Sequence, residues 1–224
     1  MKRIITLLLF VLSLTIIFTG CASLDPEEKS VEEFVEEGMK EFNGGDYVGA
    51  IVVFEKLKDW YPFSKYAILA ELKIADSYFH GEKYEDAIFA YEDFERLHPR
   101  NEAIEYVIFQ IGYCHFIQLD TPDRDQDSAR NAIKVFSRII AQFPETDYLP
   151  RAKEYIEVSK KSLTENEFYI GMYYFKRKHY KAALNRFQLV VKNHPDSNVH
   201  QKALQYISLC KELIKKEVRE EKEE

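Results

Sequence analysis

The chain has few of the residues that interrupt regular structure, with eight glycines and seven prolines among 224 residues. This scarcity argues against a β-rich architecture, in which such residues mark frequent turns. The chain also lacks an excess of positive charge: 31 lysines and arginines stand against 38 aspartates and glutamates, which gives a formal net charge of −7. Because a nucleic-acid partner would require a basic surface, we expect none.

Signatures of catalysis and metal binding are missing as well. The six histidines show no HExxH or comparable spacing, and there is no glycine-rich phosphate loop and no serine in a G-x-S-x-G context. Asp123, Asp125 and Asp127 have the first half of a calcium-loop spacing, but Ser128 and Lys134 stand where glycine and glutamate are needed. These acids fit better at a helix start, where their carboxylates accept hydrogen bonds from free N–H groups and interact favourably with the positive end of the helix dipole. We therefore predict no enzymatic activity, no metal and no cofactor.

The first thirty residues are typical of an export signal that ends in a lipid anchor. Lys2 and Arg3 precede an apolar run over residues 4–18, which is shorter than the roughly 20 residues of a membrane span. The stretch Phe18-Thr19-Gly20-Cys21 resembles a bacterial lipobox, with Phe18 at the position where leucine is usual. We predict a signal peptide over residues 1–20 and a mature chain that begins at a lipidated Cys21; an uncleaved anchor and an ordinary signal peptide are the alternatives.

The residue after the cysteine bears on the membrane in which the chain resides. Ala22 follows Cys21, and by analogy with well-understood bacterial sorting, the absence of aspartate there favours the outer membrane, on its periplasmic face. Residues 1–20 contain two basic and no acidic residues, so the mature chain has a formal charge of −9. Of the remaining cysteines, Cys114 and Cys210 lie in apolar helical runs, and we interpret both as buried thiols, with a disulfide in an oxidising periplasm as the alternative.

An internal repeat decides the fold class. Each copy ends at a proline. A tyrosine lies fifteen residues before this proline, an alanine twelve residues before it and an aromatic residue eight residues before it. Three copies begin at Tyr47, Tyr84 and Tyr180 and end at Pro62, Pro99 and Pro195; in a fourth, Ala129 replaces the tyrosine before Ala132, Phe136 and Pro144. The alanine permits close approach of two helices, the aromatic residue fills the groove one turn on, and the proline ends the helix.

Each of these helices has a partner upstream with a small residue at its contact position, namely Gly38, Ala75, Gly112 and Gly171. The pattern resembles the tetratricopeptide repeat and predicts an all-α solenoid of about five helix pairs over residues 30–216. We expect a short linker over residues 21–29, about eight extra residues in the third copy over residues 119–127, a final helix near residues 199–216, and a frayed charged tail over residues 217–224. The pattern leaves open whether residues 148–177 form one helix or two.

A closer resemblance covers about residues 21–210. Four features carry it: the lipobox, the segment Tyr61-Pro62-Phe63-Ser64-x-Tyr66, the third-copy insertion with Asp123-Arg124-Asp125, and the stretch Glu167-Phe168-Tyr169-x-x-x-Tyr173-Tyr174. In these features the chain resembles the BamD (YfiO/ComL-like) family of outer membrane assembly lipoproteins. The resemblance implies a role in folding and inserting outer membrane β-barrel proteins. The chain stops soon after the helix that follows Pro195, so a longer C-terminal extension of the family is missing, and the resemblance does not carry over the partner contacts that such an extension makes.

The resemblance also implies partners and sites. The C-terminal half would bind the POTRA domains of a BamA-like barrel subunit, beside other assembly lipoproteins, with Phe168, Tyr169, Tyr173, Arg177 and Arg186 as candidate contacts. The N-terminal repeats would hold a terminal segment of unfolded outer membrane proteins, with Tyr61, Phe63, Tyr66, Tyr78 and Arg124 as candidates. The carboxylate clamp of chaperone-binding repeats is absent, since its positions hold Val35, Met39, Leu72, Asp76, Phe168 and Met172. A periplasmic adaptor for cell-wall or division proteins is the alternative function.

Overall fold

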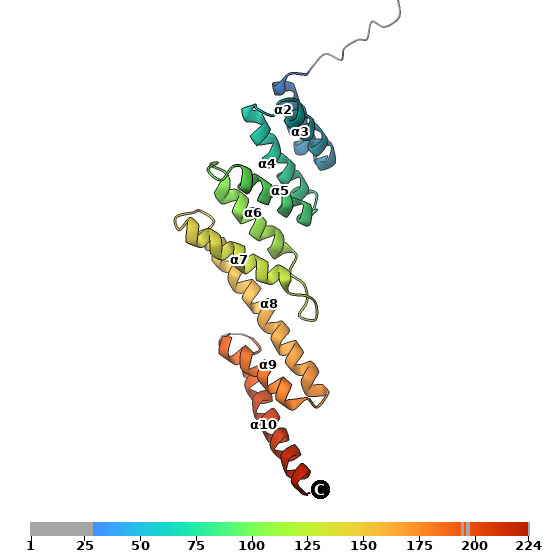
Figure 1. Ribbon diagram of the computed structural model, residues 1–224, viewed down its shortest axis with the longest axis vertical. Helices are drawn as coiled ribbons and strands as arrows, with labels where there is room; N and C mark the ends of the chain where they lie inside the picture. Colours follow the sequence, from blue (N-terminus) through green and yellow to red (C-terminus); the bar gives the residue numbers. More distant parts are fainter. Residues whose placement is uncertain (1–28, 194, 196–197, 224) are drawn as a thin grey trace, which may run out of the picture.

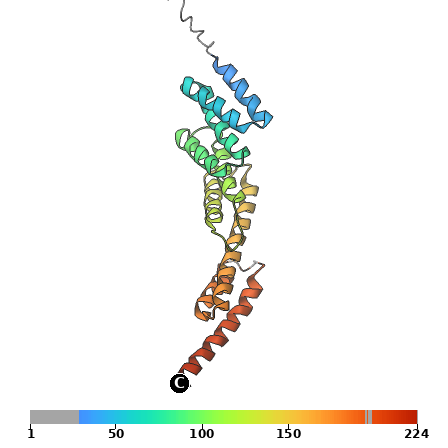
Figure 2. The same cartoon turned by 90° about the vertical axis from the view of Figure 1, so that its right-hand side faces the viewer.

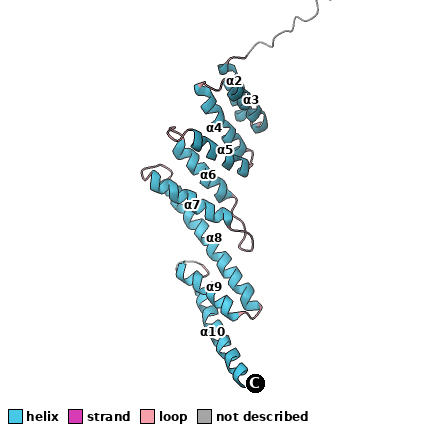
Figure 3. Ribbon diagram, in the orientation of Figure 1, coloured by secondary structure: helices cyan, strands magenta, loops and turns pink. Residues whose placement is uncertain are grey.

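The computed structural model describes residues 29–193, 195 and 198–223, and within them every regular element is an α-helix (Figure 3). The helices follow one another in sequential pairs down the long axis of the molecule (Figure 1). They are α2 (Val31–Gly44), α3 (Tyr47–Trp60), α4 (Lys65–His80), α5 (Tyr84–Leu97), α6 (Ile104–Ile117), α7 (Asp127–Gln142), α8 (Leu149–Lys176), α9 (Tyr180–Asn193) and α10 (His200–Glu223).

Short polar side chains cap the starts of α2, α3 and α4, whereas α5 to α8 begin without a side-chain cap hydrogen bond. Ser30 forms a capping box with Glu33, whose carboxylate accepts from the Ser30 backbone N–H over 2.6 Å. Asp46 and Ser64 cap α3 and α4 in the same way, by accepting from backbone N–H groups in the first turn. These caps set the short connections that turn the chain back on itself, so each helix packs mainly on its neighbours in sequence.

The repeat pattern works as predicted. Gly38, Gly112 and Gly171 each lie against the buried ring of the aromatic residue of the following helix: Phe54, Phe136 and Phe187, respectively. A Cβ atom at any of the three glycines would lie within 2.7 Å of that ring, a separation that atoms do not adopt without movement. Only a glycine therefore lets these helix pairs close to the observed distance.

The region of residues 148–177 is one helix, α8, of 28 residues. It spans about 42 Å at the α-helical rise, and it joins two apolar cores. Its first half contributes Ala152 and Ile156 to the large central core formed with α4–α7, while its second half packs Phe168 and Met172 on α9 and α10. A third core lies between α2, α3 and α4. The described residues thus contain nine helices, one fewer than five complete pairs would give.

The extra residues of the third copy form a loop that is pinned to the middle of α8. Gln126 is buried; it donates to the carbonyl oxygens of Thr121 and Arg124 over 3.1 Å and accepts from Ser162 Oγ over 2.8 Å. Asn166 Nδ2 donates to the Pro122 carbonyl over 2.6 Å. The loop therefore braces α8 where it passes from one core to the other.

One further prediction concerns the C-terminal end of the described chain. The tail was expected to fray from residue 217, but α10 continues through Glu223; its glutamates and lysines are strong helix formers, which explains the extension. Across residues 29–193, 195 and 198–223, we find no helix with both the length and the apolar character that crossing a membrane requires. Figure 2 shows α10 continuing beyond the end of its contact with α9.

Candidate functional site

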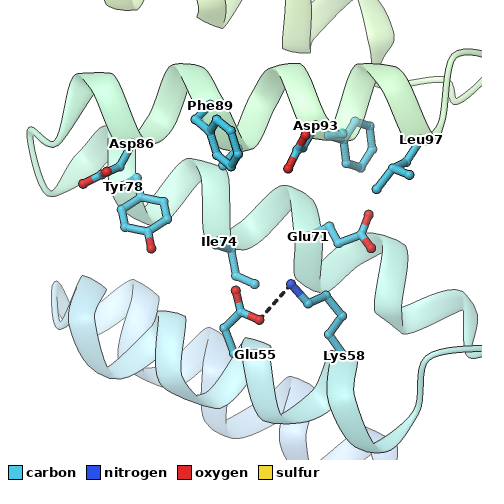
Figure 4. A pocket seen from close by; sticks show the side chains of 11 residues that line it. Glu55, Lys58, Glu71, Ile74, Tyr78, Asp86, Phe89, Asp93 and Leu97 are labelled. Atoms are coloured by element: carbon cyan, nitrogen blue, oxygen red, sulfur yellow. Dashed lines mark ion pairs between the residues drawn. The ribbon is translucent and has the colours of Figure 1, made fainter.

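A groove lies between the first two repeats, where α3, α4 and α5 meet (Figure 4). Its volume is about 250 Å³, which is less than the roughly 300–1,000 Å³ of sites that enclose small ligands. Apolar side chains form much of its surface, in particular Ile74, Tyr78, Phe89, Phe94 and Leu97. Phe89 and Leu97 are 67% and 53% exposed, respectively. An open groove of this size suits side chains of a bound segment.

The remainder of the groove carries acidic charge. Glu55, Glu71, Asp86 and Asp93 line it, and Lys58 pairs with Glu55 over 2.7 Å (Figure 4). The carboxylates outnumber the cation, so the groove disfavours a bound carboxylate. The chemistry that remains is contact with aromatic and aliphatic side chains of an extended chain.

A buried polar network supports α4 behind this groove. The carboxylate of Asp76, which is 5% exposed, accepts hydrogen bonds from the Tyr91 and Tyr106 hydroxyls and from Lys73 Nζ, each over 2.8 Å. Burial, and then the charge of Asp76, raise the pKa of both tyrosines. Tyr106 Oη also accepts from Gln110 Nε2 over 2.9 Å. The network ties α4, α5 and α6 together close to the groove, and Tyr78 lies two residues beyond Asp76 on α4.

Of the five side chains predicted for a substrate groove, Tyr78 lines this one. Tyr61 instead holds the chain before α2, since its hydroxyl donates to the Lys29 carbonyl over 2.7 Å. Tyr66 packs half-buried against the first core, Phe63 is fully exposed in the α3–α4 turn, and Arg124 is exposed on the loop before α7. The structure therefore does not gather these five residues into one site.

Phe89 and Leu97 were missed by reasoning from the sequence. Both lie on α5: Phe89 is on the face opposite Ala87 and Tyr91, and Leu97 follows buried Phe94 by one turn at the exposed end of the helix. The available signal was their position outside the repeat pattern: Phe89 falls two residues after the repeat alanine, on a helix face that packing does not require. This signal alone does not identify the site, because Val52 holds the equivalent exposed position on α3 and lies outside the groove.

The candidate partner contacts divide into an exposed stripe and packed residues. Tyr169 and Tyr173 on α8 and Arg177 at its C-terminal end are spaced four residues apart, and the Arg177 guanidinium lies 4.6 Å from the Tyr173 ring centroid. Phe168, in contrast, packs against Phe187 with ring centroids 5.5 Å apart, so it belongs mainly to the core. Arg186 is bound to Glu167 through one nitrogen and both carboxylate oxygens, at 2.9 and 3.2 Å.

The predicted lipidation site, Cys21, lies outside the described residues. Cys114 and Cys210 are both buried free thiols in different cores, which confirms their predicted state. Burial raises the pKa of the Cys114 thiol to about 12 and also raises that of Cys210, so both stay protonated near neutral pH. No group of three or more possible metal ligands occurs in the part of the chain that the structure describes.

The paired helices, with a small residue of one against an aromatic residue of the next, define a tetratricopeptide-repeat-like solenoid. The TPR2AB domain of yeast Sti1, in its pHSP90 complex, has the same kind of fold: it is 15% identical with a TM-score of 0.51, and the match covers 82% of this chain and 70% of that one. The predicted all-α repeat fold is thereby confirmed.

The model of the YfiO family, described as outer membrane lipoprotein, matches residues 27–224, and the chain therefore belongs to this family. Two relatives are named outer membrane protein assembly factor BamD. The one from Neisseria meningitidis is 27% identical over 96% of this chain and 86% of its own length. The one from Vibrio cholerae is 26% identical over 87% and 85%. These findings confirm the predicted family, and the name assembly factor agrees with the prediction of a non-enzymatic protein.

Proposed function

We propose that this chain is a lipid-anchored scaffold on the periplasmic face of the outer membrane, where it takes part in folding and inserting β-barrel proteins. Membership of an outer membrane lipoprotein family and the assembly-factor relatives support this function. In this proposal residues 1–20 are removed, Cys21 carries the lipid, and residues 30–216 form the scaffold. The anchor raises the local concentration of the scaffold near the insertion site, and no catalytic step is needed.

The observation that carries the proposal is the apolar groove between the first two repeats. Unfolded barrel proteins expose aromatic side chains and strand edges that aggregate. The exposed Phe89 and Leu97, together with Tyr78, offer an apolar surface for such side chains. The acidic rim directs the free carboxylate of a terminal segment away from the groove, so the segment is held by its side chains.

The stripe Tyr169, Tyr173 and Arg177 is the proposed contact for a POTRA domain of a BamA-like barrel subunit. Large exposed aromatic residues and arginine are enriched where proteins bind one another. The stripe lies on α8, which the insertion loop braces, so it is presented on a rigid element. This arrangement keeps the subunit contact on the C-terminal half and the substrate groove on the N-terminal half (Figure 1).

Site-specific photo-crosslinking in the full membrane-anchored chain tests the substrate groove. A crosslinker in place of Phe89 should capture an unfolded outer membrane protein. Val52 provides the matched control, because it falls two residues after the repeat alanine of α3, is 49% exposed and lies outside the groove. Phe89→Ser should weaken substrate binding about tenfold, which is the effect of removing one binding hot spot, whereas Val52→Ser should not.

The test of the whole function is the set of proteins that co-purify with the detergent-extracted, lipidated chain. The proposal is supported if a barrel subunit co-purifies and if crosslinkers placed at positions 169 and 173 of α8 both capture it to the same extent. Recovery of cell-wall enzymes without a barrel subunit would contradict it and favour the adaptor alternative. Equal substrate capture at Phe89 and Val52 would contradict the role of the groove while leaving the assembly function in place.

A further inference from the structure

The turn between α8 and α9 is strongly basic in an otherwise acidic chain. Lys176, Arg177, Lys178 and Lys181, here called the basic turn, are all exposed, while the whole chain has a formal net charge of −7. Among the described residues, no carboxylate lies within 4.0 Å of a cationic nitrogen of the basic turn. These four cations are therefore available for an outside partner.

Two other turns of the molecule have the same backbone without this charge. Each of the three turns has one residue in a left-handed conformation. It is Gly45 (φ 83°) in the α2–α3 turn, Glu82 (φ 58°) in the α4–α5 turn and Lys178 (φ 62°) in the α8–α9 turn. The next N–H bonds to a carbonyl five residues back in all three, over 3.0, 2.9 and 3.0 Å. The charges of the three turns can be compared over equivalent segments, from the aromatic residue before the turn to the repeat alanine after it. The formal charge is −1 over residues 42–50, −2 over residues 79–87 and +4 over residues 175–183. The fold thus does not require the basic turn.

Helix dipoles account for part of the charge only. Lys176 and Arg177 lie at the C-terminus of α8, where cations are favourable. Lys181, however, lies in the first turn of α9, where a cation is unfavourable, and α5 has Glu85 and Asp86 at this place. Lys178 also occupies a left-handed conformation that favours glycine. Two of the four cations are therefore placed against local preference, which points to a use outside the fold.

The basic turn borders a hollow with aromatic walls. Tyr174 and Tyr180 line it together with Lys178, His179, Lys181 and Glu217, and its volume is about 510 Å³. Arg177 lies on the adjoining surface, stacked 4.6 Å from the Tyr173 ring centroid. An open, shallow hollow that combines aromatic and basic side chains suits a polypeptide that carries carboxylates and apolar side chains.

We propose that the basic turn and this hollow form a docking site for an acidic polypeptide segment of a partner protein. The carboxylates of the segment pair with Lys178 and Lys181, and its apolar or aromatic side chains pack on Tyr174 and Tyr180. Glu217 opposes the bound segment and weakens the site. The inference rests on the proposed function only in that the partner belongs to the assembly; binding of an acidic segment does not depend on the identity of that partner.

Fluorescence anisotropy with a labelled peptide of alternating glutamate and tyrosine tests the site in the full detergent-extracted chain. Lys178→Glu together with Lys181→Glu should weaken binding at least about tenfold, since two attractive contacts become repulsive. Lys83→Glu changes the equivalent α4–α5 turn and should leave the affinity unchanged. Glu217→Gln should strengthen binding about twofold, and a peptide of alternating lysine and tyrosine should not bind at the basic turn.

Lys178→Gly separates binding from folding. Glycine suits the left-handed conformation at this position, so this variant should keep or raise the melting temperature while it weakens binding of the acidic peptide. Unchanged affinity in the double variant, an equal loss with Lys83→Glu, or binding of the basic turn to vesicles with anionic phosphatidylglycerol but not to the acidic peptide would overturn the proposal. None of these results alters the co-purification test of the proposed function, so the two can fail independently.

Discussion

Three of the repeat interfaces are closed by a glycine against a phenylalanine, whereas the second is closed by Ala75 and Tyr91. In the glycine interfaces an added Cβ would lie 2.6–2.7 Å from the ring. The rings are fully buried and have no polar atom, so shape alone decides how those helices pack. The second interface differs in that its aromatic residue carries a hydroxyl, which must be hydrogen-bonded in the same buried position.

Asp76 supplies that hydrogen bond and extends the interface to α6 through Tyr106. A buried polar network gives less stability than an apolar contact of the same size, but it specifies one arrangement of the helices that it joins. The groove lined by Tyr78 and Phe89 lies at this second repeat. The comparison indicates that three interfaces hold the solenoid together by packing, while the second also sets the geometry of the candidate site.

The largest effect is expected from filling a glycine interface. Gly112→Leu places a side chain where the buried ring of Phe136 lies 2.7 Å from an added Cβ, and overpacking of this kind should lower the free energy of unfolding by about 3 kcal/mol. Chemical denaturation of the variant measures it. Gly44→Leu is the matched control, because an added Cβ at Gly44 meets nothing within 4 Å. Equal losses in the two variants would show that the loss does not come from contact with Phe136, because leucine has the higher helix propensity at both positions.

The repeat interfaces were largely predictable from sequence because their spacing records which residues meet. The constant distances from alanine to aromatic residue to proline, with Gly38, Gly112 and Gly171 upstream, predicted the helix pairs that the structure shows. The pattern did not decide whether residues 148–177 form one helix or two, since a helix that contributes to two cores has apolar residues on a face that changes along its length.

The candidate site was harder to predict. Tyr91 and the phenylalanines at its equivalent positions satisfy the same spacing, so the sequence alone does not distinguish an apolar interface from one with a buried carboxylate. The bond between Tyr91 and Asp76 joins residues on two different helices. The groove likewise depends on where exposed apolar residues of neighbouring helices converge, and only Tyr78 among the five predicted residues lies there. Periodicity predicts burial, but it does not predict convergence on an exposed surface.

Removing the distinctive hydroxyl should have an intermediate effect. Tyr91→Phe makes the second interface resemble the others but takes one donor from buried Asp76, and it should lower the free energy of unfolding by about 2 kcal/mol. In an Asp76→Leu background the same substitution should have little effect, so a double-mutant cycle measures the coupling. Additive effects would show that the hydroxyl and the carboxylate do not act as a pair. The converse change, Phe136→Tyr, should destabilise the protein, because the third interface offers the hydroxyl no carboxylate.

The smallest effect is expected from pH. Burial raises the pKa of Tyr91 and Tyr106 above the ordinary tyrosine value, and the charge of Asp76 adds to this shift. Above about pH 10 the unfolded chain loses protons that the folded protein retains, so stability is complete below this pH and falls as the pH rises. The melting temperature should therefore drop more between about pH 8 and pH 11 in the wild type than in Tyr91→Phe, because phenylalanine has no proton to lose. Equal drops in the two proteins would place the alkaline sensitivity in other groups and would leave the second interface without a distinct response to pH.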